Sequence, residues 1–190
     1  MVAVQSTMLP LGSPAPDFAL QAADGSSVAR DDLRGGALVV AFICNHCPFV
    51  RHIAPALATV TAELMDAGAA VVAINANDPE AYPDDDLAHM AVEATERGYR
   101  FPYLFDATQE VAKAYRAACT PDLYVFDGER RLVYRGQFDA TRPGGEPATG
   151  ADLRAAVEAT LAGRAVADDQ APAVGCNIKW RPGNAPDYFG

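Results

Sequence analysis

The stretch ALVVAFICNHCPFV, residues 37–50, decides the fold class of this chain. Its first half, Ala37 to Ile43, is continuously apolar, which is typical of a strand buried on both faces of a sheet. Apolar residues then recur at helical spacing from Pro48 to Ala67, and a second apolar run spans Ala69 to Asn75. The order strand, helix, strand predicts a βαβ unit with parallel strands.

Turn residues divide the rest of the chain into short elements. Ala23 to Ser26 predicts an N-terminal hairpin, and Asp127 to Arg130 predicts a second hairpin between two apolar segments. Further helices are expected over residues 84–97, 109–117 and 152–161, with a short strand over residues 101–105. No periodicity follows Arg164. We therefore predict one α/β domain over residues 1–164, with an irregular C-terminal tail, residues 165–190, packed on the same domain.

Composition excludes several classes of partner. The 190 residues carry 15 Lys plus Arg against 25 Asp plus Glu, a formal net charge of −10. Such a charge repels phosphate backbones and anionic lipid, so neither nucleic acid nor a membrane surface is an expected partner. The N-terminus has no basic segment of the kind that begins an export signal, and the longest apolar run is shorter than half of the ~20 residues that a bilayer span needs. We expect a cytoplasmic protein.

Four cysteines are too few for a disulfide framework, so their positions matter more than their number. The motif Cys44-Asn45-His46-Cys47 begins where the buried strand ends and the helix begins. A helix N-terminus stabilises an anion, so the pKa of the Cys44 thiol is expected to be lowered, with help from a protonated His46. Cys47 lies one helical turn away, at a spacing that permits a disulfide. These positions predict that Cys44 attacks a substrate disulfide and that Cys47 resolves it.

Two other interpretations of the cysteine pair stay open. As a structural crosslink, so small a loop would contribute only about 2 kcal/mol, in a compartment that disfavours the bond. As half of a zinc site, the pair would need ligands from Cys119, Cys176, His46 or His52, and the sequence has no second paired motif. Neither a metal nor a cofactor is predicted.

The two remaining cysteines have either a structural or a redox interpretation, and one acidic run has a structural one. Cys119 precedes Pro121 by two residues and is either a buried small hydrophobe or an additional redox thiol. Cys176 lies in the aperiodic tail, and we expect it to act as a third redox thiol if the tail packs over the cysteine motif. The run Asp84 to Asp86 is most simply a helix cap.

The motifs resemble those of a known superfamily. The order of strand, Cys-x-x-Cys, helix, strand, and later Thr120-Pro121 before a hairpin resembles the thioredoxin fold. The resemblance implies a central mixed sheet flanked by helices and a cis-proline, Pro121, that faces the thiols. The segment GSPAPDF, residues 12–18, is similar to the alkyl hydroperoxide reductase/thiol-specific antioxidant (AhpC/TSA) branch. Three further segments, residues 44–50, 101–106 and 175–180, resemble a peroxiredoxin-like redoxin group.

Departures from these families narrow the function. Where thioredoxins have a tryptophan and an acid before the first cysteine, this chain has Ile43 and Leu38. Where peroxiredoxins have the proline and threonine of their peroxide-binding pattern, it has Val40 and Cys44, although Cys47 is followed by proline as in that family. The departures favour disulfide exchange over peroxide reduction.

The sequence therefore predicts a thiol-disulfide oxidoreductase in which Cys44 and Cys47 exchange disulfides, His46 tunes the thiolate and Pro121 shapes the substrate edge. Its partners would be protein or small-molecule disulfides. One alternative is an antioxidant thiol peroxidase, in which peroxide oxidises one of the two cysteines and a thioredoxin-like protein returns the electrons. Another is a non-catalytic metal-binding or redox-sensing adaptor. The oligomeric state is not predicted.

Overall fold

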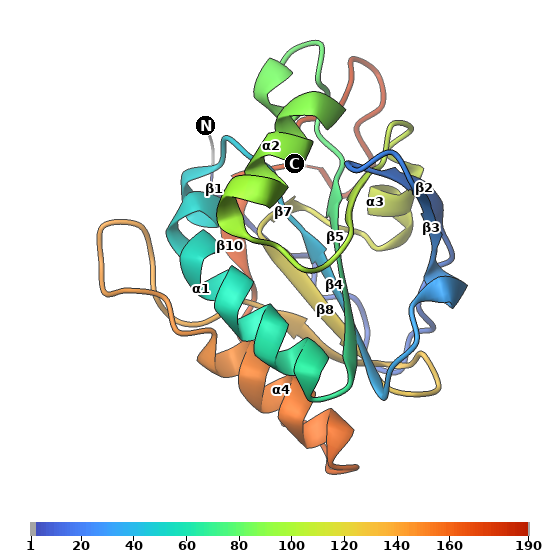
Figure 1. Cartoon of the computed structure of the whole chain (residues 1–190), viewed down its shortest axis with the longest axis vertical. Coiled ribbons are helices and arrows are strands. Elements are labelled where there is room, and N and C mark those ends of the chain that lie inside the picture. Colours follow the sequence, from blue (N-terminus) through green and yellow to red (C-terminus); the bar gives the residue numbers. More distant parts are fainter. Residues whose placement is uncertain (1–2, 190) are drawn as a thin grey trace.

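The structure is a computed structural model that describes residues 3–189. In this part of the chain a twisted mixed sheet has the strand order β3-β2-β6-β5-β4-β8-β9 (Figure 1). Its strands are β2 (Ala19–Ala22), β3 (Ser27–Ala29), β4 (Ala37–Phe42), β5 (Ala69–Asn75), β6 (Tyr103–Phe105), β8 (Asp122–Phe126) and β9 (Leu132–Gly136). The predicted βαβ unit is confirmed, because β4 and β5 are parallel with Ala37 opposite Ala69 and Phe42 opposite Ile74.

Helices cover both faces of this sheet (Figure 1). They are α1 (Pro48–Asp66), α2 (Leu87–Arg97), α3 (Glu110–Ala114) and α4 (Ala151–Leu161), with short 3-10 turns at Arg30–Asp32 and Pro83–Asp85. Helices α1, α2 and α4 pack on one face, while α3 and the N-terminal segment around Phe18 pack on the other. Among the described residues, no helix has both the length and the hydrophobicity that crossing a membrane requires.

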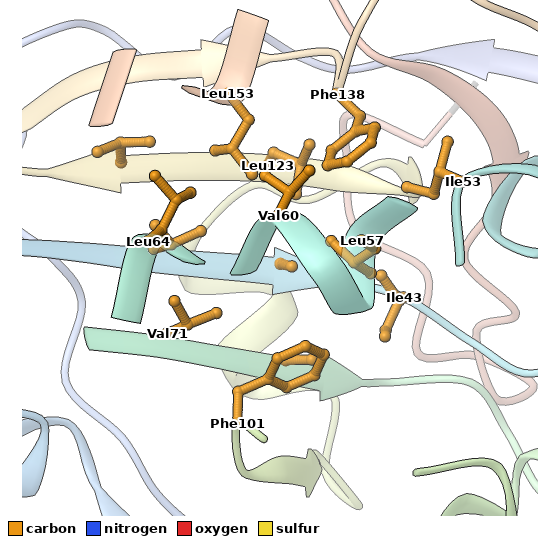
Figure 2. Close-up of a cluster of buried hydrophobic side chains, with 14 of the residues drawn as sticks. Ile43, Ile53, Leu57, Val60, Leu64, Val71, Phe101, Leu123, Phe138 and Leu153 are labelled. Carbon is orange, nitrogen blue, oxygen red and sulfur yellow. The ribbon is translucent and has the colours of Figure 1, made fainter. Parts of the chain in front are cut away.

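The buried strand β4 explains why the sequence pattern is so clear. Its side chains alternate between two cores: Val39 and Ala41 pack beneath α1 and α4, while Leu38 and Val40 pack on the opposite face. Figure 2 shows the first core, in which Leu57, Val60 and Leu64 of α1 face Leu123 of β8 and Leu153 of α4. Because both faces are covered, the strand end that carries the cysteine motif is rigidly placed.

A second, smaller sheet was not predicted. It joins β1 (Ala3–Gln5), β10 (Val174–Asn177) and β7 (Cys119–Thr120) in the order β1-β10-β7, all antiparallel. The prediction that the tail after Arg164 is irregular is therefore wrong for Val174–Asn177. These strands are too short to show an alternating pattern, and they form because the edge of β7 supplies the missing backbone hydrogen bonds.

Two expected helices are shorter than the pattern suggested. Helix α2 begins at Leu87 because Asp86, the N-cap, accepts a hydrogen bond from the His89 amide. Helix α3 covers only Glu110–Ala114, since left-handed backbone conformations occur at Gln109 and at Arg116 on either side of it. The Thr120–Pro121 peptide bond is cis, which confirms the expectation for Pro121.

Candidate redox site

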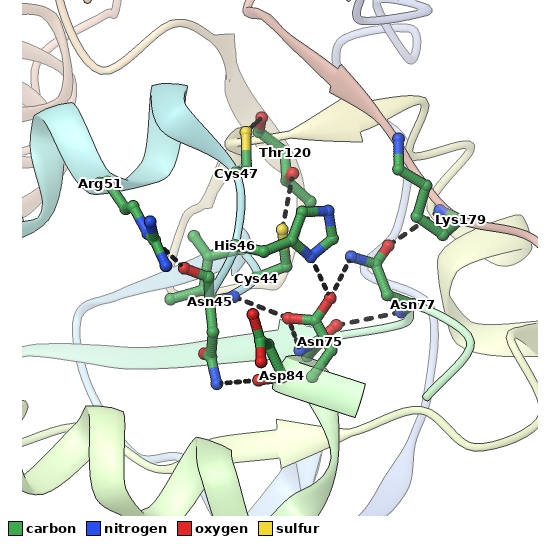
Figure 3. Close-up of polar contacts among 12 residues, drawn as sticks. Cys44, Asn45, His46, Cys47, Arg51, Asn75, Asn77, Asp84, Thr120 and Lys179 are labelled. Atoms are coloured by element: carbon green, nitrogen blue, oxygen red, sulfur yellow. Dashed lines mark hydrogen bonds and ion pairs between the residues drawn. The ribbon is translucent and has the colours of Figure 1, made fainter. Parts of the chain in front are cut away.

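The two motif cysteines lie between the end of β4 and the start of α1, facing the cis peptide (Figure 3). Both are buried, with 1% of Cys44 and 0% of Cys47 exposed. The Cys44 Sγ lies 3.2 Å from the Thr120 Oγ1, and the Cys47 Sγ lies 3.1 Å from the Thr120 carbonyl oxygen, to which it donates when it is protonated. Thr120 thus contacts both sulfurs, whereas the sequence predicted a role only for its neighbour, Pro121.

The pKa of the two thiols is shifted in opposite directions. The Cys44 thiol donates to the Cys47 sulfur, and this hydrogen bond is the main cause that lowers the pKa of Cys47 to about 5; burial opposes it, and donors from Cys176 and Val50 assist. Burial, followed by its hydrogen bond to Cys47, raises the pKa of Cys44 well above the ordinary value. The expectation that Cys44 carries the lowered pKa is wrong, because Cys44 is the donor and Cys47 the acceptor of the hydrogen bond between them, and Cys47 is the residue that directly precedes α1.

His46 is held by the buried carboxylate of Asp85, a residue of the acidic run that was predicted to cap a helix. Its Nδ1 lies 2.6 Å from the Asp85 Oδ2, and the same carboxylate accepts from the Asn45 amide and from the side chains of Asn75 and Asn77. Burial alone would raise the pKa of Asp85, but these hydrogen bonds, led by that of His46, keep the pKa below its ordinary value. Since the carboxylate is ionised, the His46 Nδ1 carries the proton.

The signal for Asp85 was present but ambiguous. Three consecutive acids before a helix are explained by capping, and only Asp86 caps α2. Asp84 is exposed, whereas Asp85 is fully buried. Asn75 and Asn77 follow β5 at the sheet edge where β4 also ends, so a polar cluster at that edge could have been expected from the parallel topology.

The outer face of the site is formed by aromatic and histidine rings. The His46 ring stacks on Tyr82 with centroids 5.0 Å apart, and its side chain is 13% exposed. Together with Pro83, these two rings line a surface pocket of about 330 Å³. The His46 side chain is therefore the most exposed part of the motif, and the buried Cys44 sulfur lies within 4.8 Å of one of its ring nitrogens.

The other two cysteines differ in their relation to this pair. Strand β10 places Cys176 opposite Thr120, and the Cys176 thiol hydrogen-bonds the Cys47 sulfur. Cys119 donates instead to the Pro121 carbonyl at 3.5 Å, and burial raises the pKa of its thiol well above the ordinary value. His52, proposed as a zinc ligand, bonds the Thr141 hydroxyl at 2.9 Å.

Three side chains of the site have metal-ligand chemistry. Cys44, His46 and Asp85 each offer one ligand atom, and these atoms lie within 4.8 Å of one another. Three ligands are the set of an open zinc site, one fewer than a structural site uses. However, the two Asp85 oxygens already accept four hydrogen bonds, which leaves little capacity for a metal ion.

Comparison with known proteins agrees with the geometry. The profile of the AhpC/TSA family matches residues 11–135, which include the cysteine motif, α1 and the cis-proline. The chain belongs to the AhpC/TSA family. The C-terminal segment with β10 lies beyond the matched residues.

Individual relatives place this family member on the thioredoxin fold. A conserved protein from Geobacillus kaustophilus is 52% identical, with a TM-score of 0.93 over 96% of this chain and 98% of that one. A thiol:disulfide interchange protein of the thioredoxin family from Chlorobium tepidum has a TM-score of 0.63 at 22% identity, over 79% and 97% of the two chains. The thiol-disulfide oxidoreductase ResA of Bacillus subtilis is 24% identical over 122 residues, 64% of each chain, so the match spans less than two thirds of that relative.

Proposed function

We propose that this protein is a thiol-disulfide oxidoreductase that cycles between the Cys44–Cys47 dithiol and disulfide. The observation that carries the proposal is the shared hydrogen bond between the two sulfurs, which leaves Cys47 with a pKa of about 5 at the N-terminus of α1. A thiolate at neutral pH beside a protonated thiol is the arrangement that disulfide exchange needs.

The geometry supports an exchange with the roles of the two cysteines reversed relative to the sequence prediction. The Cys47 thiolate attacks one sulfur of a substrate disulfide, a Cys47–substrate bond forms, and the other substrate sulfur leaves as a thiolate. Cys44 then attacks the Cys47 sulfur, forms the Cys44–Cys47 disulfide, and passes its proton to the departing thiolate. The substrate gains two electrons from the two cysteines and one proton from Cys44, and solvent supplies the proton for the other substrate thiolate.

His46 and Pro121 support these steps without contributing electrons. The charge of Asp85 raises the pKa of Cys44, and the His46 Nδ1 bonds the same carboxylate, so His46 acts on the cysteines by holding Asp85 in place. The Thr120 hydroxyl and carbonyl, next to Pro121, contact the Cys44 and Cys47 sulfurs. We assign Pro121 the role of shaping this edge for substrate.

Insulin reduction with dithiothreitol as electron donor tests the proposal. We expect activity in the wild type, its loss in Cys47→Ser, and accumulation of a mixed disulfide on Cys47 in Cys44→Ser, with Cys119→Ala as the matched control. Trapping on Cys44 in the Cys47→Ser variant would restore the roles predicted from the sequence. Wild-type protein that never forms a reversible Cys44–Cys47 bond would overturn the proposal.

A thiol peroxidase is the second candidate, because both sulfurs are almost fully buried and a small oxidant reaches them more easily than a protein does. Peroxide would convert the Cys47 thiolate to a sulfenate, and Cys44 would displace water to form the same disulfide. An antioxidant role in the cytoplasm, with a thioredoxin-like reductant, belongs to this candidate. Catalytic peroxide consumption in the absence of insulin reduction would favour it.

A further inference from the structure

We propose that Cys176 is a second resolving thiol, which closes a disulfide with Cys47 when Cys47 carries an oxidised or substrate-bound sulfur. This inference rests on the proposed redox function of Cys47 and extends the active dithiol to a set of three thiols. It assigns a chemical task to the C-terminal segment, which lies outside the residues matched by the family profile.

The first observation is the strand register. Cys176 of β10 lies directly opposite Thr120 of β7, and the Thr120 carbonyl is the atom to which the Cys47 thiol donates. The Cys176 side chain hydrogen-bonds the Cys47 sulfur, and only 2% of Cys176 is exposed. The two sulfurs thus lie in hydrogen-bond contact within the buried core, and a disulfide forms when they approach to bonding distance.

The second observation is that the backbone is shaped for this approach. A Cβ on Gly175 would lie 2.0 Å from the Thr120 carbonyl oxygen, so only glycine allows β10 to come this close to β7. Beyond Cys176, the Lys179 amide donates to Asn77 at 2.8 Å and the Asp78 amide donates to the Lys179 carbonyl at 2.9 Å. Cys176 is therefore held from both sides of the strand, which gives it a high effective concentration at Cys47.

The pKa of the Cys176 thiol is expected to fall when Cys47 reacts. Burial, followed by the hydrogen bond to Cys47 and the charge on its sulfur, raises the pKa of Cys176 to about 12, while Lys179 opposes the increase. A covalent bond on Cys47 removes the negative charge, so two of the causes that keep Cys176 protonated disappear. Cys176 becomes more nucleophilic only after Cys47 has been modified.

The step balances in atoms and electrons. With a Cys47 sulfenic acid, Cys176 attacks the Cys47 sulfur, the S–O bond breaks, the Cys47–Cys176 bond forms, and the thiol proton leaves with hydroxide as water. With a Cys47–substrate disulfide, the S–S bond to the substrate breaks and the substrate leaves as a thiol. Cys176 is oxidised in each case, and the Cys47 sulfur of the sulfenic acid or the departing substrate sulfur is reduced.

The test uses full-length protein with hydrogen peroxide as the probe oxidant and dimedone to label sulfenate. The variants are Cys44→Ser, Cys44→Ser with Cys176→Ser, and Cys44→Ser with Cys119→Ser as the matched control. In Cys44→Ser and in the control, we expect a Cys47–Cys176 crosslinked peptide and little dimedone on Cys47. Removal of Cys176 should lengthen the lifetime of the Cys47 sulfenate by at least about tenfold.

Each outcome decides the inference. Equal sulfenate lifetimes with and without Cys176, or a Cys44→Ser protein whose Cys47 does not react, would overturn it. If the wild type still forms the Cys44–Cys47 disulfide under the same oxidant, only the inference about Cys176 has failed. If the wild type does not form this disulfide, the proposed function itself has failed. Gly175→Ala in the Cys44→Ser background provides a second variant with all three remaining thiols intact, and it should also lengthen the sulfenate lifetime.

Discussion

At the scale of single residues, the character of the site depends on which sulfur receives hydrogen bonds. The Cys47 sulfur accepts from the thiols of Cys44 and Cys176 and from the backbone amides of Cys176 and Val50. Such a set of donors stabilises an anion, in a place where burial alone would disfavour one. The residue that lies first in the motif thus acts as donor, and the second holds the charge.

Replacement of Cys44 by alanine removes the donor that contributes most to the thiolate. We expect the pKa of Cys47 to rise from about 5 in the wild type, because burial then acts with less opposition. The measurement is the pH dependence of thiolate absorbance in the reduced protein. Cys119→Ala should leave the midpoint near that of the wild type, and an unchanged midpoint in Cys44→Ala would contradict the assignment of the donor.

Asp85→Asn tests the buried carboxylate. The substitution removes a charged acceptor that four groups hydrogen-bond. We therefore expect the free energy of unfolding to fall by about 1–3 kcal/mol at pH 7. The folded pKa of Asp85 is below the unfolded value of 3.8, so its stabilisation is full above that value and is lost as the pH falls through the folded pKa. The difference between variant and wild type should therefore narrow below about pH 4.

Urea unfolding at neutral and acidic pH measures this effect. The exposed neighbour provides the matched control, since Asp84→Asn removes one charge from the same turn without touching His46. A constant difference between Asp85→Asn and the wild type across the acidic range would show that the carboxylate is not ionised in the folded protein.

At the scale of elements, the site is assembled where the ends of β4 and β5, the turn before α2, and the β7–β10 pair meet. The βαβ unit supplies the two cysteines, and the turn at Pro83–Asp85 supplies the carboxylate. Strand β10 closes the remaining side. No single element carries the whole site, which explains why each piece was ambiguous when it was considered alone.

Gly175→Ala disturbs one of these elements selectively. The added Cβ clashes with the Thr120 carbonyl, so β10 has to move away from β7 at a cost of about 1–3 kcal/mol. We expect a lower melting temperature and faster alkylation of Cys47 in the native protein. Gly128→Ala is the control, because its Cβ would make an ordinary contact at 3.7 Å. Unchanged alkylation and stability would show that β10 does not cover the thiols.

At the scale of the whole molecule, one hydrophobic core packs on each face of the large sheet, and the C-terminal segment pairs with a strand near the N-terminus. Strand β10 pairs with β1 near the N-terminus and with β7 in the middle, so three distant segments enclose the thiols. The formal net charge of the chain is −10, and within the site His46 bonds Asp85 while the charge of Lys179 acts to lower the pKa of Cys176. A net negative charge of this size repels anionic molecules.

Removal of metal tests the adaptor alternative on the intact protein. The Asp85 oxygens are occupied by four hydrogen bonds, so we expect zinc well below one equivalent after purification and the same melting temperature before and after dialysis against a chelator. Metal analysis and thermal unfolding are the measurements. Nearly stoichiometric zinc, together with a lower melting temperature after chelation, would instead favour a metal-binding protein.

The sequence by itself determined the β4–α1–β5 unit and the placement of the cysteine motif at its strand-to-helix junction, whereas the cis-proline was implied by the resemblance to the thioredoxin fold. These features depend on local periodicity and on short motifs, which a linear pattern records. Only the tertiary structure decided that Cys47 holds the lowered pKa, that Asp85 fixes His46 and that Cys176 joins the pair. A pKa and a buried contact depend on groups brought together from distant parts of the chain, and local spacing does not encode their distances.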